Sequence, residues 1–291
     1  MAQRALPERE TRLGRPRGAV GRAPHAVVLV LPGGGRTGGT RRGAALAATV
    51  SAVPLARRLA RTTSDDDPVI THIVHYRHGG RGADPSVGAG VGASASGAAS
   101  GAGHGHGDGV SRVAAACAAD AESAVAEVVR RYGDVPVCLV GTDIGALAAL
   151  RTAGHEAVAS VAALGPLLCE PADGAGAAPV DGGDEEPVQQ LRGRHVLIVH
   201  GTNDTRCHPE LSFRLAERAK KVNAQVCRFE VHTDGHGLRG YAAEVAALTQ
   251  DFVLGTLCGG DLCRPLTDAL AAPPPLGLRM PLASGFGKNL R

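Results

Sequence analysis

The segment from Val135 to Leu150, with the sequence VPVCLVGTDIGALAAL, constrains the fold of this chain more than any other stretch. Its first part is a short apolar run rich in β-branched residues, which is typical of a buried strand. Gly141 and Gly145 then bracket a sharp turn, and small residues in a helical pattern follow at once. Glycine permits strained backbone and lets a helix pass close to a sheet. The segment therefore predicts a strand, a tight turn and a helix, with Asp143 projecting above the sheet at the helix N-terminus.

Apolar runs and amphipathic segments alternate along most of the remaining chain. Six strands separated by helices predict an α/β fold with a mostly parallel, doubly wound sheet, because parallel strands need helical crossovers on both faces. We expect the strands at residues 25–31, 69–76, 135–140, 158–164, 195–200 and 224–231, and the helices at residues 43–61, 110–132, 144–153, 209–222 and 238–257.

Stretches without periodicity set the domain boundaries that we expect. Residues 1–24 contain Arg and Pro but no regular apolar pattern, which predicts a disordered arm. Residues 25–258 form one α/β domain, interrupted at residues 82–109 by a low-complexity insertion rich in Gly, Ala and Ser. Residues 259–291 contain three consecutive prolines and form a C-terminal tail that lies over the surface.

Composition and charge narrow the classes of function. A hydrophobic fraction of 44% in 291 residues can build a sizeable core, and a net charge of +3 does not indicate a nucleic-acid partner. No apolar run approaches the length of a membrane span. The seven cysteines are scattered and form no C-x-x-C pair, so we expect free thiols, mostly buried, and a cytoplasmic location.

Two further motifs resemble binding sites but lack a feature that such sites need. The loop at residues 32–35, Pro-Gly-Gly-Gly, follows the first strand and can aim backbone N–H groups at an anion, but no G-K-[ST] motif follows it. Its glycines also lack the spacing of a dinucleotide-binding loop. His104, His106 and Asp108 alternate in a way that could contact a metal, but no rigid element holds them. We therefore expect no metal and no cofactor.

Three strand ends carry the residues from which a site could be built. Asp143 follows the third expected strand, Asp204 follows the fifth within VLIVHGTNDTRCHPE, and His236 follows the sixth within VHTDGHGLRG. Sites in open α/β sheets assemble at the carboxyl ends of the strands. With its nucleophile-acid-histidine order, the chain resembles the α/β-hydrolase superfamily over about residues 25–257. It is similar in particular to the capless, dienelactone-hydrolase-like bacterial branch.

This resemblance implies a three-layer α/β-hydrolase fold in which the strand-turn-helix segment is a nucleophile elbow. It also implies the roles of a catalytic triad and of the backbone donors that bind an oxyanion. The implied residues are Asp143 as nucleophile, Asp204 as triad acid, His236 as general base, and the backbone N–H groups of Ile144 and of Gly34 or Gly35 as the oxyanion hole. Turn roles for Asp204, beside the helix near Pro209, and for His236 remain alternatives.

Asp143 stands where most members of the superfamily carry Ser. A carboxylate that attacked an ester would form a mixed anhydride, whereas displacement at a saturated carbon, as in epoxide opening, suits it well. Haloalkane dehalogenases and epoxide hydrolases of this fold carry Asp there, but they use Trp or Tyr groups that this chain, with no Trp, does not offer in the same places.

Two hypotheses follow from this departure. The first is a hydrolase that acts on a small organic electrophile of the epoxide, ester or lactone class with an Asp-His-Asp triad, in which Asp143 is the nucleophile or a base acting on water. The second is a catalytically inactive α/β-hydrolase-like protein that binds a ligand or a partner. We favour the first, with a small-molecule substrate as partner, because the acid and the histidine both occur at the expected strand ends.

Overall fold

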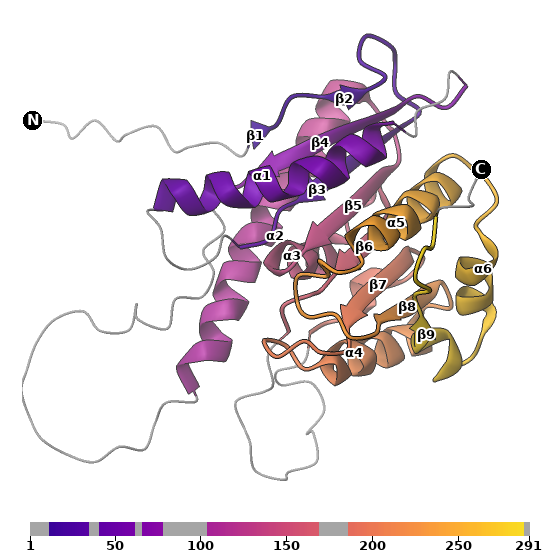
Figure 1. Ribbon diagram of the computed structural model, residues 1–291. Helices are drawn as coiled ribbons and strands as arrows, with labels where there is room; N and C mark the ends of the chain where they lie inside the picture. The colour runs from indigo at the N-terminus through magenta and orange to yellow at the C-terminus, as the bar shows by residue number, and fades with distance from the viewer. Residues whose placement is uncertain (1–11, 35–40, 62–65, 78–103, 169–185, 288–291) are drawn as a thin grey trace, which may run out of the picture.

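A computed structural model describes residues 12–34, 41–61, 66–77, 104–168 and 186–287 of the chain (Figure 1). At its centre is a sheet with the strand order β1-β4-β3-β5-β6-β7-β8-β9, and β2 pairs with β4 beside β1. The six expected strands form the parallel middle of this sheet, which confirms the predicted fold class. They are β3 (Ala26–Leu31), β4 (Val69–His75), β5 (Val137–Thr142), β6 (Val158–Leu164), β7 (His195–Gly201) and β8 (Val226–Val231).

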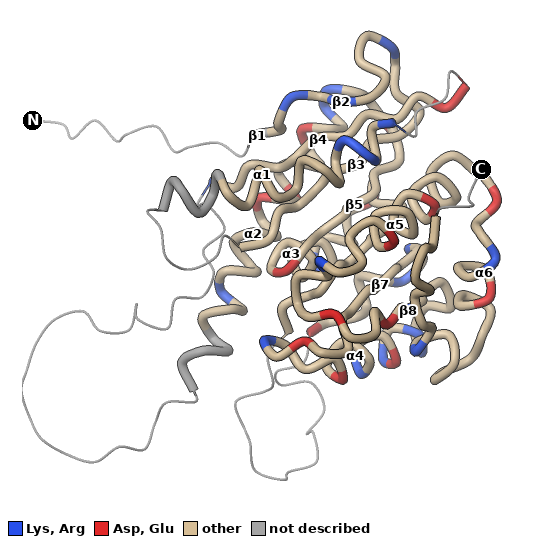
Figure 2. Tube along the Cα trace, viewed as in Figure 1, with Lys and Arg blue, Asp and Glu red and all other residues tan. Residues whose placement is uncertain are grey.

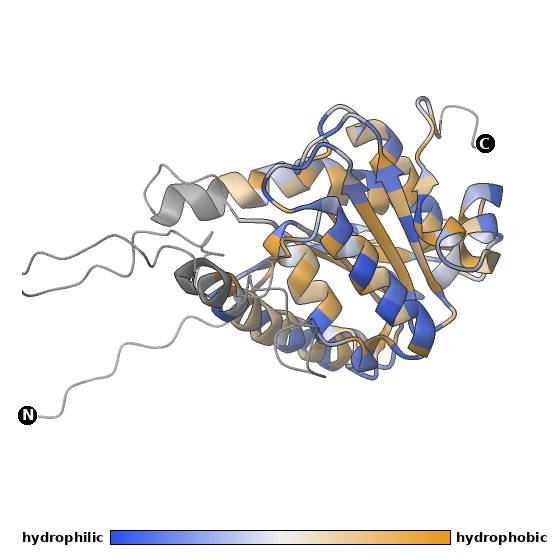
Figure 3. Ribbon diagram, turned by 90° about the horizontal axis from the view of Figure 1, so that it is seen from below, coloured by the Kyte–Doolittle hydropathy of each residue, from blue (hydrophilic) through white to orange (hydrophobic). Residues whose placement is uncertain are grey.

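Helices cover both faces of the sheet and bury a core on each. In β3, Val27 and Leu29 face the core under α2, α3 and α4, whereas Val28 and Val30 face the core under α1 and α5. The strands are apolar along most of their length (Figure 3), as expected for strands buried on both faces. The helices are α1 (Arg41–Ala60), α2 (His104–Tyr132), α3 (Ile144–Thr152), α4 (Pro209–Val222) and α5 (Ala242–Leu257), with a short 3-10 turn, η1 (Gln189–Leu191), before β7.

The prediction of a disordered arm at residues 1–24 is wrong for part of that segment. Two short strands, β1 (Arg12–Leu13) and β2 (Arg17–Gly18), pair antiparallel with β4. His72 helps to hold them, because its ring Nδ1 lies 2.7 Å from the carbonyl oxygen of Gly14. Strands of two residues are too short to show periodicity, so they are recognisable only through the edge of β4 that they satisfy. The first eleven residues of the arm lie outside the described part of the chain.

The insertion and the tail also contain regular structure. The backbone of α2 is helical from His104, six residues before the expected start, although nothing is described of the side chains of His104, His106 and Asp108 or of residues 82–103. The tail forms α6 (Arg264–Ala271), a 3-10 turn η2 (Leu276–Leu278) and β9 (Met280–Pro281), which extends the sheet beside β8. The tail therefore packs against the domain, and its buried residues Leu266, Ala269 and Leu282 belong to the core under α1 and α5.

Charged residues, cysteines and apolar helices are distributed as follows in the described residues. Charged residues of both signs gather along α4, whereas the central strand β5 carries none (Figure 2). The six cysteines within the described ranges are all free, and four of them are buried. Within the same ranges, no helix has both the length and the apolar character needed to span a bilayer.

Candidate active site

The turn between β5 and α3 holds Asp143 in a strained backbone conformation. Asp143 has φ 55° and ψ −123°, which lies outside the regions favoured by side-chain-bearing residues. The turn is held by hydrogen bonds from Asp143 N to Leu164 O (3.1 Å) and from Ala146 N to Asp143 O (3.1 Å). A Cβ on Gly145 would lie 2.5 Å from Pro32 O, so only glycine lets α3 pass this close to the end of β3. The sequence thus builds the expected sharp turn with Asp143 at its tip.

Asp204 lies in the turn after β7, and its side chain is fully buried. Its Oδ1 accepts hydrogen bonds from the backbone N–H groups of Arg206 (2.8 Å) and Cys207 (3.1 Å). Its Oδ2 lies 2.6 Å from His236 Nδ1 and 3.0 Å from His200 Nε2. Burial opposes ionisation, but the hydrogen bonds from both histidines, the charge of His236 and the N–H of Cys207 together hold the pKa of Asp204 well below its usual range. Asp204 is therefore a fixed buried anion.

His236 lies in a loop after β8 that neighbouring strand ends hold in place. The carboxylate of Asp234 accepts the backbone N–H groups of Gly235 (2.8 Å) and Tyr241 (3.1 Å), and Asp234 O accepts that of Asn203 (2.9 Å). These contacts tie the loop to itself and to the turn after β7. The imidazole is thereby directed between the ends of β5 and β7.

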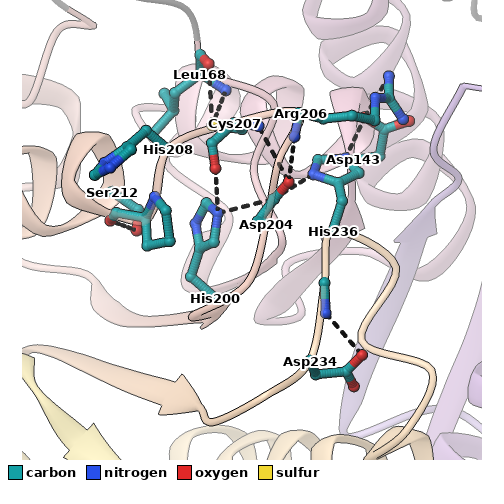
Figure 4. A network of polar contacts seen from close by, with 12 residues as sticks. Asp143, Leu168, His200, Asp204, Arg206, Cys207, His208, Ser212, Asp234 and His236 are labelled. Carbon is teal, nitrogen blue, oxygen red and sulfur yellow. Dashed lines mark hydrogen bonds and ion pairs between the residues drawn. The ribbon is translucent and has the colours of Figure 1, made fainter.

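Asp143, His236 and Asp204 form a continuous hydrogen-bonded chain (Figure 4). His236 Nε2 lies 3.0 Å from Asp143 Oδ1, and His236 Nδ1 lies 2.6 Å from Asp204 Oδ2. Burial lowers the affinity of the imidazole for its second proton, but the hydrogen bonds and charges of the two carboxylates outweigh it and raise the pKa of His236 to about 9. At neutral pH the ring is thus an imidazolium between two anions.

The two oxygens of Asp143 have different surroundings. Oδ2 accepts the backbone N–H of Gly34 at 3.0 Å, whereas Oδ1 faces His236. Ile144 is the first residue of α3, so its backbone N–H has no partner within the helix. Gly35, the other expected donor, lies outside the described residues. The arrangement places an N–H donor of the glycine loop directly at the expected nucleophile.

Two neighbours of the site were not predicted from the sequence. His200 ends an expected strand and begins the His-Gly-x-x-Asp run that supports the resemblance, but the sequence predicts no role for its side chain. It stands four residues before Asp204, close enough for the turn to fold back on it. Arg206 places Nη2 3.9 Å from Asp143 Oδ1, with 56% of its side chain exposed. Its position two residues after Asp204, in a turn expected at the same edge of the sheet as Asp143, is the signal that points to it.

Comparisons with known proteins agree with this architecture. A sequence model of the prolyl oligopeptidase family matches residues 184–258, a segment that contains Asp204 and His236 but not Asp143. No curated protein matches the chain in sequence.

Solved structures match over most of the chain. The esterase PE8 is 16% identical with a TM-score of 0.57, and the match covers 84% of this chain and 100% of that one. TT1662 from Thermus thermophilus is 19% identical with a TM-score of 0.56, covering 86% and 99%. The Pyrococcus furiosus esterase Pf2001 is 15% identical with a TM-score of 0.53, covering 80% and 83%. Together with the sheet order and the two helical layers, these likenesses show that this chain has the three-layer α/β-hydrolase fold.

Proposed function

We propose that this protein is a hydrolase that acts on a small organic electrophile of the epoxide, ester or lactone class, with Asp143 as nucleophile, His236 as acid and base, and Asp204 as the residue that orients His236. The observation that carries this proposal is the hydrogen-bonded chain from Asp143 Oδ1 through His236 to Asp204 Oδ2. The likeness of the fold to the esterases PE8 and Pf2001 supports hydrolysis as the reaction type.

The chemistry of a carboxylate favours an epoxide among these substrates. In the first step an oxygen of Asp143 bonds to a ring carbon, the carbon–oxygen bond of the ring breaks, and the leaving alkoxide takes the proton of the His236 imidazolium. The proton is available because the pKa of His236 is raised to about 9 in the resting site. The product of this step is a neutral ester on Asp143 and a neutral imidazole.

The same step prepares His236 for its second task. Forming the ester removes one of the two negative charges that hold the proton on His236, so the pKa of the ring falls. The neutral ring then takes a proton from water, and the water oxygen attacks Cγ of the ester. Charge developing on the carbonyl oxygen is stabilised by the N–H of Gly34 and by the N–H of Ile144, which has no partner within α3. On collapse the bond between Cγ and the ester oxygen breaks, and the leaving alkoxide takes the proton that remained on the attacking water oxygen. This releases the second hydroxyl group of the product and restores the carboxylate of Asp143, while His236 keeps the proton that it took from water.

The proposal extends to the branch of the superfamily and to the cellular location. We place the protein in the capless, dienelactone-hydrolase-like branch because the segment at residues 165–194 is short and irregular in sequence. A cytoplasmic location is supported by the free cysteines. The inactive alternative gains no support from the site, because Asp143, His236 and Asp204 keep direct hydrogen-bond contact.

The decisive experiment combines substrate turnover with isotope labelling. The purified chain is incubated with a panel of epoxides, lactones and aryl esters, and the substrate that reacts is turned over repeatedly in ¹⁸O-labelled water. Mass spectrometry of the peptide containing Asp143 should then show ¹⁸O in its carboxylate, because each cycle cleaves the bond between Cγ and one carboxylate oxygen. His236→Gln should show neither turnover nor label, because Gln can neither protonate the leaving alkoxide of the first step nor activate water for the second.

A matched control separates this mechanism from its alternatives. Asp268→Asn, on the exposed helix α6, removes a carboxylate away from the site and should leave turnover unchanged. Turnover without label on Asp143 would show that Asp143 acts as a base on water. A protein that binds members of the panel but turns none of them over would support the inactive alternative.

A further inference from the structure

A second histidine contacts the acid of the site from inside the sheet. His200 lies on β7 and is fully buried. Its Nε2 lies 3.0 Å from Asp204 Oδ2 and 3.2 Å from Cys207 O (Figure 4). Both neighbours are hydrogen-bond acceptors, so Nε2 must carry the hydrogen and donate it.

The other ring nitrogen of His200 fixes its charge. Nδ1 is buried and has no hydrogen-bond partner among the described residues. A hydrogen on Nδ1 would be a buried donor without an acceptor, which is costly. His200 is therefore a neutral imidazole whose single N–H points at Asp204.

Asp204 Oδ2 is consequently shared by two histidines. The N–H of His200 and the N–H of His236 converge on it at 3.0 Å and 2.6 Å, while Oδ1 is held by backbone N–H groups. The positive ends of the two N–H dipoles meet at one oxygen. Because both N–H groups share this oxygen, each one weakens the hydrogen bond that the other donates to it.

We propose that His200 is a positioning residue of this site, which shares Oδ2 of Asp204 with His236 and so limits how firmly His236 holds its second proton. This inference rests on the proposed function for its catalytic meaning, since His236 must both give and take a proton during one cycle.

The charged and polar groups around His236 determine whether removing His200 raises or lowers the pKa of His236. Asp143, from the turn between β5 and α3, and Asp204, after β7, face the ring directly, and the guanidinium of Arg206 lies 3.9 Å from Asp143 Oδ1. His200 adds the positive end of a dipole behind Asp204, which disfavours the imidazolium form of His236. Removing that dipole should let Asp204 hold the proton on His236 more firmly.

The test is an NMR titration of the His236 ring in the full chain, without substrate. In His200→Leu, which has no donor, the pKa of His236 should rise by about half a pH unit or more. In His200→Gln, whose amide N–H reaches about as far as Nε2, it should stay at the wild-type value. His195→Leu, at the opposite end of β7, removes a histidine from the same strand and should also leave it unchanged.

Three results would overturn the inference: an unchanged value in His200→Leu, a lowered value, or an equal rise in His200→Gln. If His200→Leu does not fold, His200→Asn replaces it, because its shorter amide does not reach Oδ2. Thermal unfolding of each variant identifies a purely structural role, which would lower the midpoint without moving the titration. Because no turnover is needed, the titration stands or falls independently of the ¹⁸O experiment that tests the proposed function.

Discussion

Replacing Asp143 with Asn tests the idea that the charge of this residue holds the proton on His236. The pKa of His236 is raised from 6.5 to about 9, with the hydrogen bonds and charges of Asp143 and Asp204 acting against burial. That difference corresponds to roughly 3 kcal/mol of preference for the imidazolium. Removing one of the two anions should therefore lower the pKa by about one unit or more, or about 1.4 kcal/mol.

The pKa of His236 should fall in Asp143→Asn whichever way the new amide is oriented. If its oxygen faces His236, the hydrogen bond remains but the negative charge is lost. If its oxygen turns to accept the N–H of Gly34, its NH₂ group faces His236 Nε2, which must then be an unprotonated acceptor. Asp143→Asn also imitates the neutral ester of the proposed intermediate, so the titration measures directly how far ester formation frees the base.

The assay is an NMR titration of the His236 ring nitrogens, with an unfolding series at several pH values as a second measure. Because the folded-state pKa of His236 is raised, its stabilising contribution is complete below pH 6.5 and is lost as pH rises through about 9. In Asp143→Asn, where the pKa of His236 is lower, this stabilising contribution should be lost at a lower pH than in the wild-type protein. Asp268→Asn serves as the control variant. A pKa that stays near 9 in Asp143→Asn would refute the reasoning, because Asp143 would then contribute little to holding the proton.

Three further predictions follow from the same geometry. Gly145→Ala should lower the free energy of unfolding in urea by about 1–3 kcal/mol, because its Cβ would lie 2.5 Å from Pro32 O; an unchanged midpoint would contradict the close approach. Asp204→Asn should reduce kcat by about 10³–10⁴-fold, since the amide has one accepting oxygen where the carboxylate has two and cannot accept both the backbone N–H groups and the N–H groups of the two histidines. Turnover of an epoxide should fall as pH rises through about 9, where His236 loses the proton that it donates; a rate that keeps rising would exclude this role.

The sequence was sufficient for the sheet and for the location of the site. Apolar runs such as AVVLVL in β3 are fully buried on both faces, so their composition reports their place directly. The glycines of the turn after β5 are equally informative, because α3 cannot pass the end of β3 with a Cβ there. His236 lies within hydrogen-bond distance of both Asp143 and Asp204 because parallel strands end at the same edge. Their catalytic roles stay predictions.

What the sequence concealed depends on contacts between distant segments. β1 and β2 have two residues each and exist because β4 offers a free edge, which no local pattern records. His200 is surrounded by apolar neighbours in the strand, and only the turn that returns Asp204 beneath it creates its contact. The protonation of His236 likewise requires two carboxylates from separate turns, so the residues alone leave it undefined.

The hydrogen bonds of the site join parts of the chain that are far apart in order. The bond from Gly34 to Asp143 spans 109 residues, and the bond from Asp143 to His236 spans 93. Closing loops of this length before any contact compensates for them is slow, and it requires several parallel strands to be in register together. We therefore expect the site to assemble late in folding, in the same cooperative step as the sheet. A signal from the His236 ring should accordingly appear with the kinetics of global folding rather than ahead of it.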